Sequence, residues 1–155
     1  MSRGLALVVL PGACTGAAPR PADPTEFNAG FGEARPTQVG RYRIALQLEP
    51  DPPPLGELFQ VHAVVTLDDG TPVETGKLSL NARMPKHDHG METLPKVRPG
   101  ACVTADTDAP PVCRHPGGRY TADGFKFHMG GDWTVMVDVD GPAGPDSTTF
   151  VYRMP

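Results

Sequence analysis

The feature that most constrains the fold of this chain is a series of short segments in which apolar and polar residues alternate. In residues 41–50, Tyr42, Ile44 and Leu46 lie on one side of an extended chain and Arg43 lies on the other. A period of two is typical of a β-strand with one buried face. Proline and glycine, 19 and 18 of the 155 residues, separate these segments and mark turns. The same pattern predicts strands within residues 57–70, 71–84, 118–141 and 146–154.

These segments predict an all-β protein with six or seven short strands and no helix. Two antiparallel sheets packed face to face bury one side of every strand, so we expect an immunoglobulin-like β-sandwich of about seven strands. It forms one domain, residues 40–155, with Trp133 in the core and His62 on the outer surface. The net charge of −4, with no Lys/Arg cluster longer than two residues, argues against nucleic acid or an anionic membrane surface as a partner.

The N-terminus has the order of a bacterial export signal. Residues 1–14 contain one basic residue, Arg3, then an apolar run that is too short to span a bilayer, and end in "GAC". This ending resembles a lipobox, which predicts that Cys14 is lipidated; Pro11 stands where leucine is usual. A plain cleaved signal, a misplaced start codon and a cytosolic chain are the alternatives. Residues 15–39, rich in Pro, Ala and Gly, predict a disordered tether. We therefore expect a periplasmic protein or a membrane-anchored extracytoplasmic lipoprotein, in contact with the membrane only through lipid.

The other two cysteines, Cys102 and Cys113, flank the polar, proline-rich sequence "VTADTDAPPV". Disulfides persist in oxidising compartments, and a disulfide here would stabilise the chain by about 3 kcal/mol through loop closure. The alternative is a metal dithiolate, but the spacing is wider than in a CxxC zinc motif and no second pair exists. We predict the disulfide.

The sequence "MPKHDHGM", which begins at Met84, concentrates soft metal donors in one loop. If its backbone is extended, His87 and His89 point to the same side, and Gly90 allows a tight turn that brings Met91 back towards them. Imidazole combined with thioether sulfur favours copper, Cu(I) above all, whereas magnesium and calcium need oxygen ligands. The alternative is a solvated or structural loop with no metal.

A further histidine lies at the end of a later strand. His128 and Met129 precede a Gly-Gly turn, and strand ends meet at the poles of a sandwich. Met129 is in phase with Phe125 and Phe127, which predicts a core position, whereas His128 is out of phase and free to act as a ligand. The predicted metal ligands are Met84, His87, His89, Met91 and His128, with Met84 as a reserve ligand or a core residue.

Two of these motifs, taken in order, resemble a known family. "NARMPKHDHGMETLPKV" followed by "GRYTADGFKFHMGGDWTVMVDV" is similar to the YtkA-like/FixH-like domain family, over roughly residues 40–153. The resemblance implies an extracytoplasmic immunoglobulin-like domain, and some relatives are linked to copper handling and to assembly of haem–copper oxidases. The chain lacks the transmembrane helix of the FixH proteins proper, and its cysteine insertion is longer than the usual connection. The motif donors that the resemblance implies are Met84, His87, His89, Met91, His128 and Met129.

The expected function is that of a copper-binding carrier, buffer or accessory to copper-enzyme assembly, with an assembly or transport protein as its partner. An enzyme is not expected, because there is no GxSxG motif and no cysteine remains as a nucleophile if the disulfide forms. The alternatives are a structural or protein-binding β-sandwich lipoprotein without metal, and a lipoprotein that senses metal for a transporter.

Overall fold

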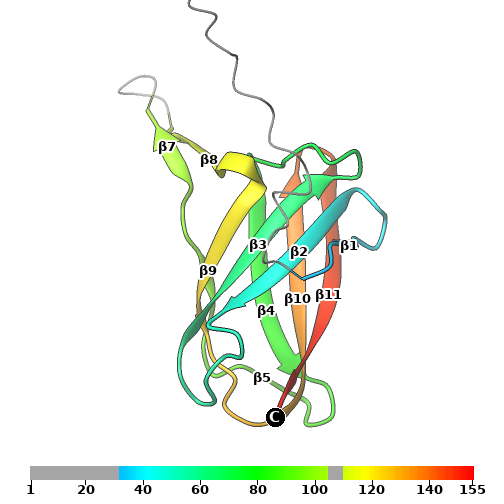
Figure 1. The fold of residues 1–155 in the computed structure, drawn as a ribbon. Coiled ribbons are helices and arrows are strands. Elements are labelled where there is room, and N and C mark those ends of the chain that lie inside the picture. Colours follow the sequence, from blue (N-terminus) through cyan, green and yellow to red (C-terminus); the bar gives the residue numbers. More distant parts are fainter. Residues whose placement is uncertain (1–31, 105–109) are drawn as a thin grey trace, which may run out of the picture.

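The computed structural model describes residues 32–104 and 110–155, which form an antiparallel β-sandwich. One sheet has the strand order β1-β2-β3-β9-β6 and the other the order β11-β10-β4-β5, and the two sheets face each other across the core (Figure 1). A separate pair, β7 and β8, projects from one end. The predicted all-β sandwich is confirmed.

The strands in the described part of the chain number eleven rather than about seven, so the predicted count is wrong. Five of them are only two or three residues long, and segments of that length carry no readable alternation. A short 3₁₀ helix, η1 (Pro116–Gly118), precedes β9. The strands are β1 (Arg35–Pro36), β2 (Tyr42–Glu49), β3 (Phe59–Leu67), β4 (Lys77–Met84), β5 (His89–Gly90), β6 (Lys96–Val97), β7 (Ala101–Val103), β8 (Val112–Arg114), β9 (Arg119–Phe125), β10 (Gly131–Gly141) and β11 (Gly144–Met154).

The core follows the alternation seen in the sequence. Every second residue of β4 is buried and those between are exposed, and every second residue of β10 from Trp133 to Val139 is buried, with half-buried or exposed residues between. Trp133 has no exposed surface, and its ring stacks on Phe127 with the centroids 4.7 Å apart. The predicted core position of Trp133 is therefore confirmed. Met84 is also a core residue, with 2% of its surface exposed.

The domain begins earlier than the predicted residue 40. The Gly32 amide donates to the Leu46 carbonyl at 3.2 Å, and β1 pairs with β2. A few residues later the Gln38 amide donates to the Ser147 carbonyl of β11 at 2.8 Å. Residues 32–39 thus connect the edges of both sheets and are not a tether. The predicted signal, the Cys14 lipidation site and residues 15–31 of the predicted tether lie outside the described residues.

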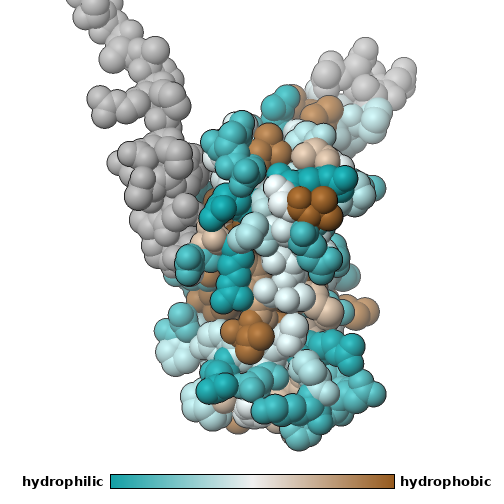
Figure 2. Space-filling view, turned by 90° about the vertical axis from the view of Figure 1, so that its right-hand side faces the viewer, coloured by the Kyte–Doolittle hydropathy of each residue, from teal (hydrophilic) through white to brown (hydrophobic). Residues whose placement is uncertain are grey.

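The side of the sandwich that carries the edge strand β11 is shown in Figure 2. Hydrophobic residues are scattered there among hydrophilic ones and do not gather in one patch. Scattered apolar residues are normal on a monomer surface and indicate no partner by themselves. No helix among the described residues has the length and apolar character needed to cross a membrane.

Asp146 holds the N-terminal segment against β11. Its carboxylate accepts hydrogen bonds from the Thr37 hydroxyl at 2.6 Å and from the amides of Val39, Arg41 and Ser147 at 2.9–3.2 Å. Burial raises the pKa of Asp146, but these hydrogen bonds outweigh burial and lower it to about 2. A carboxyl whose pKa is lowered on folding stabilises the fold above its unfolded pKa of about 4, and that stabilisation is lost as pH falls towards 2.

Asp146→Asn is therefore expected to destabilise the domain by about 1 kcal/mol at pH 7, the net value of a typical hydrogen bond. The difference from wild type should shrink at pH 2.5, where the native carboxyl is becoming protonated. Urea unfolding at both pH values measures this. Asp138→Asn is the matched control, because Asp138 is exposed and accepts one long hydrogen bond from Ser79 at 3.3 Å. A difference that did not change with pH would contradict this role of the Asp146 charge.

The cysteine insertion forms the β7–β8 hairpin, and the predicted disulfide is confirmed. Cys102 and Cys113 lie directly opposite each other in the hairpin and are bonded. The hairpin joins the body of the sandwich through His115, whose ring stacks on Tyr120 at 3.9 Å and whose amide donates to the Glu74 carbonyl at 2.7 Å. Figure 1 shows the hairpin at the end of the sandwich opposite β5.

Candidate metal centre

The loop "MPKHDHGM" is a tight β-hairpin and not an extended segment. Residues 85–88 form a turn between β4 and β5, closed by the His87 amide, which donates to the Met84 carbonyl at 3.1 Å. Asp88 adopts a left-handed backbone with φ of 51°, while Gly90 lies in β5 opposite Arg83. The prediction that an extended backbone aligns the two histidines, and that Gly90 makes the turn, is therefore wrong.

Two of the predicted ligands nevertheless lie side by side. The rings of His89 and His128, one from β5 and one from the segment after β9, have centroids 5.0 Å apart with planes tilted by 34°. Two imidazoles that bind one ion through bonds of about 2.0–2.1 Å place their centroids roughly 5 Å apart. The His128 Nδ1 atom is buried and has no hydrogen-bond partner in the described part of the chain. A buried ring nitrogen without a partner is unusual, and a water molecule or a metal ion could satisfy it.

Trp133 forms the inner wall of this histidine pair. Its ring lies edge-to-face with His128 at 5.3 Å and with His89 at 6.1 Å between centroids. Its indole Nε1 donates to the Met129 carbonyl at 3.0 Å, which fixes the turn that carries His128. Trp133 thus lies against one side of the pair, and both histidine side chains are half-buried.

His87 lies at the edge of this group. Its ring centroid is 5.9 Å from that of His89, and its side chain is exposed. It also lines a pocket of about 390 Å³, together with Met84, Lys86, Gly131, Asp132, Arg153 and Met154. His87 therefore lines a pocket to which neither His89 nor His128 contributes.

The methionines differ in how accessible they are. Met91 and Met129 are half-buried and pack against the edge of the core. Met84 and Met154 are almost fully buried, and the Met84 methyl group lies 2.8 Å from where a Cβ on Gly131 would stand. Of the predicted donors, Met91 is placed to offer sulfur near the surface, whereas Met84 serves the core. Met154 was not predicted as a donor, because it ends β11 and no other candidate donor lies near it in the sequence.

Glu92 is a charged neighbour of the histidine pair that the sequence reasoning missed. Its carboxylate pairs with Lys126 Nζ at 3.2 Å. The hydrogen bond and charge of Lys126 lower the pKa of Glu92, and positive charge on His128 and His89 lowers it further. The sequence feature that could have pointed to Glu92 is its position directly after Met91. Asp88, the carboxylate within the loop itself, pairs with Arg83 at 2.8 Å.

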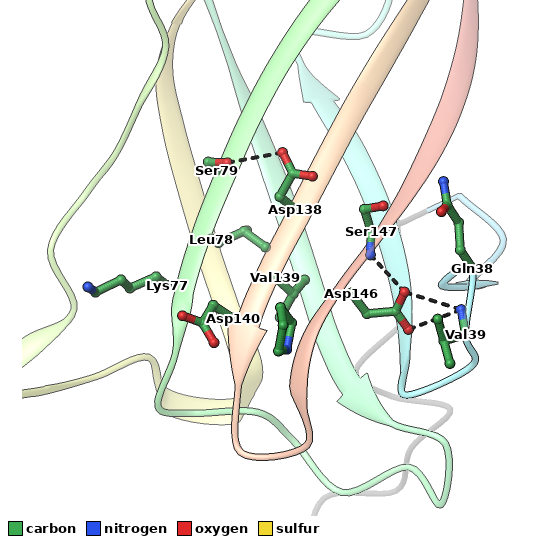
Figure 3. A pocket seen from close by; sticks show the side chains of 11 residues that line it. Gln38, Val39, Lys77, Leu78, Ser79, Asp138, Val139, Asp140, Asp146 and Ser147 are labelled. Atoms are coloured by element: carbon green, nitrogen blue, oxygen red, sulfur yellow. Dashed lines mark hydrogen bonds between the residues drawn. The ribbon is translucent and has the colours of Figure 1, made fainter.

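The histidine pair does not belong to a larger cluster of metal-binding side chains among the described residues. The described residues contain no group of three or more His, Cys, Asp or Glu side chains arranged to hold a metal ion. A pocket of about 610 Å³ lies on β4, β10 and β11, where Asp138, Asp140 and Asp146 approach it, and Asp146 is hydrogen-bonded to Val39 and Ser147 (Figure 3). Asp140 is seven residues along β10 from Trp133, about 23 Å at the usual rise of 3.3 Å per residue. This pocket is therefore separate from the histidine pair.

Comparison with known proteins supports the fold and gives no information about the function. No family model matches the chain, and no curated protein matches its sequence. Among solved structures, a DUF4426 family protein from Pseudomonas aeruginosa is similar over 79% of this chain and 96% of its own, with a TM-score of 0.50 and 12% identity. The GAE domain of GGA2p from Saccharomyces cerevisiae covers 81% of this chain and 94% of its own, with a TM-score of 0.35 and 10% identity, which is too low to carry an argument. The resemblance to YtkA-like/FixH-like domains stays a prediction.

Proposed function

We propose that this protein binds Cu(I) outside the cytoplasm, through His89 and His128 with Met91 as a thioether donor. The observation that carries the proposal is the 5.0 Å approach of the two imidazoles, one of which has a buried nitrogen with no hydrogen-bond partner among the described residues. His87 joins from the solvent side. Imidazole and thioether together suit Cu(I), which accepts few, soft and neutral ligands.

The surroundings of the pair support a site that exchanges its metal and is not a permanent cofactor site. The histidines are half-buried and lie against Trp133 at one pole of the sandwich. An open pole allows a second protein to approach the ion directly. The role is that of a copper carrier, a buffer or an accessory to copper-enzyme assembly, and the partner is an assembly or transport protein. The resemblance to YtkA-like/FixH-like domains and the oxidised cysteine pair both fit an extracytoplasmic location.

A structural or protein-binding β-sandwich without metal is the second candidate. It is favoured by the completeness of the β4–β5 hairpin, whose turn is closed by its own backbone bond and by the Arg83–Asp88 ion pair. Such a loop keeps its shape without an ion. The two candidates differ in one measurable property, affinity for Cu(I).

Anaerobic Cu(I) titration against a competing chelator tests the proposal. Trp133 is the chain's one tryptophan and lies against both rings, so its fluorescence should change as copper binds. Replacing His89 and His128 together by alanine should weaken Cu(I) binding roughly 100-fold or more, because both metal–imidazole bonds are lost. Met91→Leu keeps the volume and removes the sulfur, so a loss of about 10-fold is expected without a change in fold.

His62→Ala is the matched control, since His62 lies on the outer face of β3, hydrogen-bonded to Thr121 at 3.0 Å and Glu49 at 2.6 Å. It should leave Cu(I) affinity unchanged. If the double histidine variant bound Cu(I) as tightly as wild type, the site would lie elsewhere and the structural candidate would be preferred.

A further inference from the structure

The outer edge of β11 offers backbone hydrogen-bonding groups to a partner. β11 pairs with β10 along its whole length, and it is the edge strand of its sheet (Figure 1). The Gln38 amide donates to the Ser147 carbonyl, so Ser147 directs its backbone groups away from β10. Because this direction alternates from residue to residue in an antiparallel ladder, Thr149, Val151 and Arg153 also direct their N–H and C=O groups away from β10.

Residues 149–153 form the free edge of β11. The backbone groups that Thr149, Val151 and Arg153 direct outwards have no hydrogen-bond partner within residues 32–104 and 110–155. Two common protections of an edge strand are also missing there, since the free edge contains no proline and its register with β10 has no bulge. Val151, in the middle, is 63% exposed. Such an edge is a template for a further strand.

We propose that two copies of this chain form a symmetric dimer by pairing their free edges in an antiparallel β11–β11 contact. The twofold axis passes beside Val151, so that Val151 of one copy faces Val151 of the other. Thr149 of each copy then faces Arg153 of the other. Two facing residues that direct their backbone groups at each other exchange two hydrogen bonds, so the three pairs make about six. The dimer joins two sheets into one.

A second copy suits this edge because the edge is symmetric about Val151. Gln38 occupies the Ser147 carbonyl on one side of the free edge, and β11 ends at Met154 on the other. Val151 is the middle one of the three residues that point outwards between these limits. A rotation of half a turn about Val151 therefore places every outward-pointing residue of one copy opposite one of the other, and the whole free edge is used.

The charges on the free edge are compatible with this self-pairing. Arg153 is its one charged residue, and the Arg153 guanidinium already pairs with Asp132 at 2.8 Å. Arg153 faces the uncharged Thr149 of the other copy. The two Arg153 residues of the dimer lie on opposite sides of the axis, offset along the strands by about 13 Å. This exceeds the Debye length of about 8 Å at physiological salt, so their repulsion is screened.

Sedimentation velocity of the metal-free full chain tests the proposal. Cys14→Ser is present in every sample, so that this third cysteine cannot link two chains by a disulfide. A contact of this size is expected to be weak, so the protein is studied from about 10 µM to about 1 mM, and the dimer fraction should rise over that range.

Val151→Lys places like charges opposite each other at the axis and should weaken the dimer by about 10-fold or more. Val151→Pro removes the central N–H without removing a bond to β10, and should also give a monomer. Val103→Lys is the matched control, because it makes the same change at a valine that is 69% exposed on the β7–β8 hairpin. It should leave the dimer unchanged.

Hydrogen exchange at single amides, followed by NMR, locates the contact. The amides of Thr149, Val151 and Arg153 should become more protected as the concentration of the wild-type domain rises, and in Val151→Lys they should stay unprotected. The amides of Phe150 and Tyr152, which bond to β10, should be protected at every concentration.

Three outcomes overturn the proposal. A chain that stays monomeric at about 1 mM with these amides unprotected leaves the free edge to a strand of a different protein. Protection that is complete at the lowest concentration means that one chain covers its own edge. A dimer that Val103→Lys dissociates and Val151→Lys does not is formed by another surface. All samples lack copper, so none of these results bears on the proposed Cu(I) site.

Discussion

Replacing Trp133 by alanine is expected to lower the free energy of unfolding by about 3–5 kcal/mol, the usual cost of removing a buried aromatic side chain. Trp133 has no exposed surface, stacks on Phe127 at 4.7 Å and lies against both His89 and His128. The loss is a large part of the 5–15 kcal/mol that stabilises a typical domain. Because the same ring is the floor of the histidine pair, Cu(I) affinity should fall with stability.

Trp133→Phe separates these two effects. It keeps an aromatic ring in the core but removes the N–H donor, so the Met129 carbonyl loses its 3.0 Å bond. We expect a loss of only about 1–2 kcal/mol, because a hydrogen bond and part of a ring are removed. Cu(I) affinity should still weaken, since the turn that carries His128 is no longer fixed. Urea unfolding followed by circular dichroism, with Cu(I) titration of the folded variant, checks both; an alanine variant as stable as wild type would contradict the core role.

Period-two alternation was enough to predict the sandwich, because burial of one strand face is a local property that every second residue records. Tyr42 and Ile44 on β2, and Leu78 and Leu80 on β4, are buried as the pattern requires. The short strands escaped prediction because two or three residues contain no period. Arg35–Pro36 escaped for the same reason, and its pairing with β2 depends on the partner and not on its own composition.

The site was predictable in its donors and not in its geometry. The topology brings His89 and His128 together. His89 begins β5 and His128 follows β9, and these positions lie at the same pole of the sandwich. The turn that separates His87 from them depends on the left-handed backbone of Asp88, which composition does not fix. Glu92 escaped because its position beside the pair is set by Lys126, a residue 34 positions away.

The second large effect is expected at Gly118, where η1 passes into β9. Its φ of 67° is in the left-handed region, and a Cβ there would stand 2.2 Å from the Val65 carbonyl oxygen and 3.1 Å from the Val73 amide nitrogen. Those two atoms are hydrogen-bonded to each other at 2.9 Å. Both are backbone atoms that cannot rotate away. Gly118→Ala should therefore force the β3 backbone to shift and cost about 3 kcal/mol or more.

Gly40→Ala provides the matched control for this prediction. Gly40 has a similar left-handed φ of 80°, but a Cβ there meets nothing within 4 Å. Its alanine variant therefore measures the conformational cost alone, about 1 kcal/mol. Urea unfolding of both variants gives the packing cost at Gly118 by difference. Equal destabilisation would mean that the backbone around Val65 relaxes freely, and that η1 is not packed as tightly against β3 as the geometry requires.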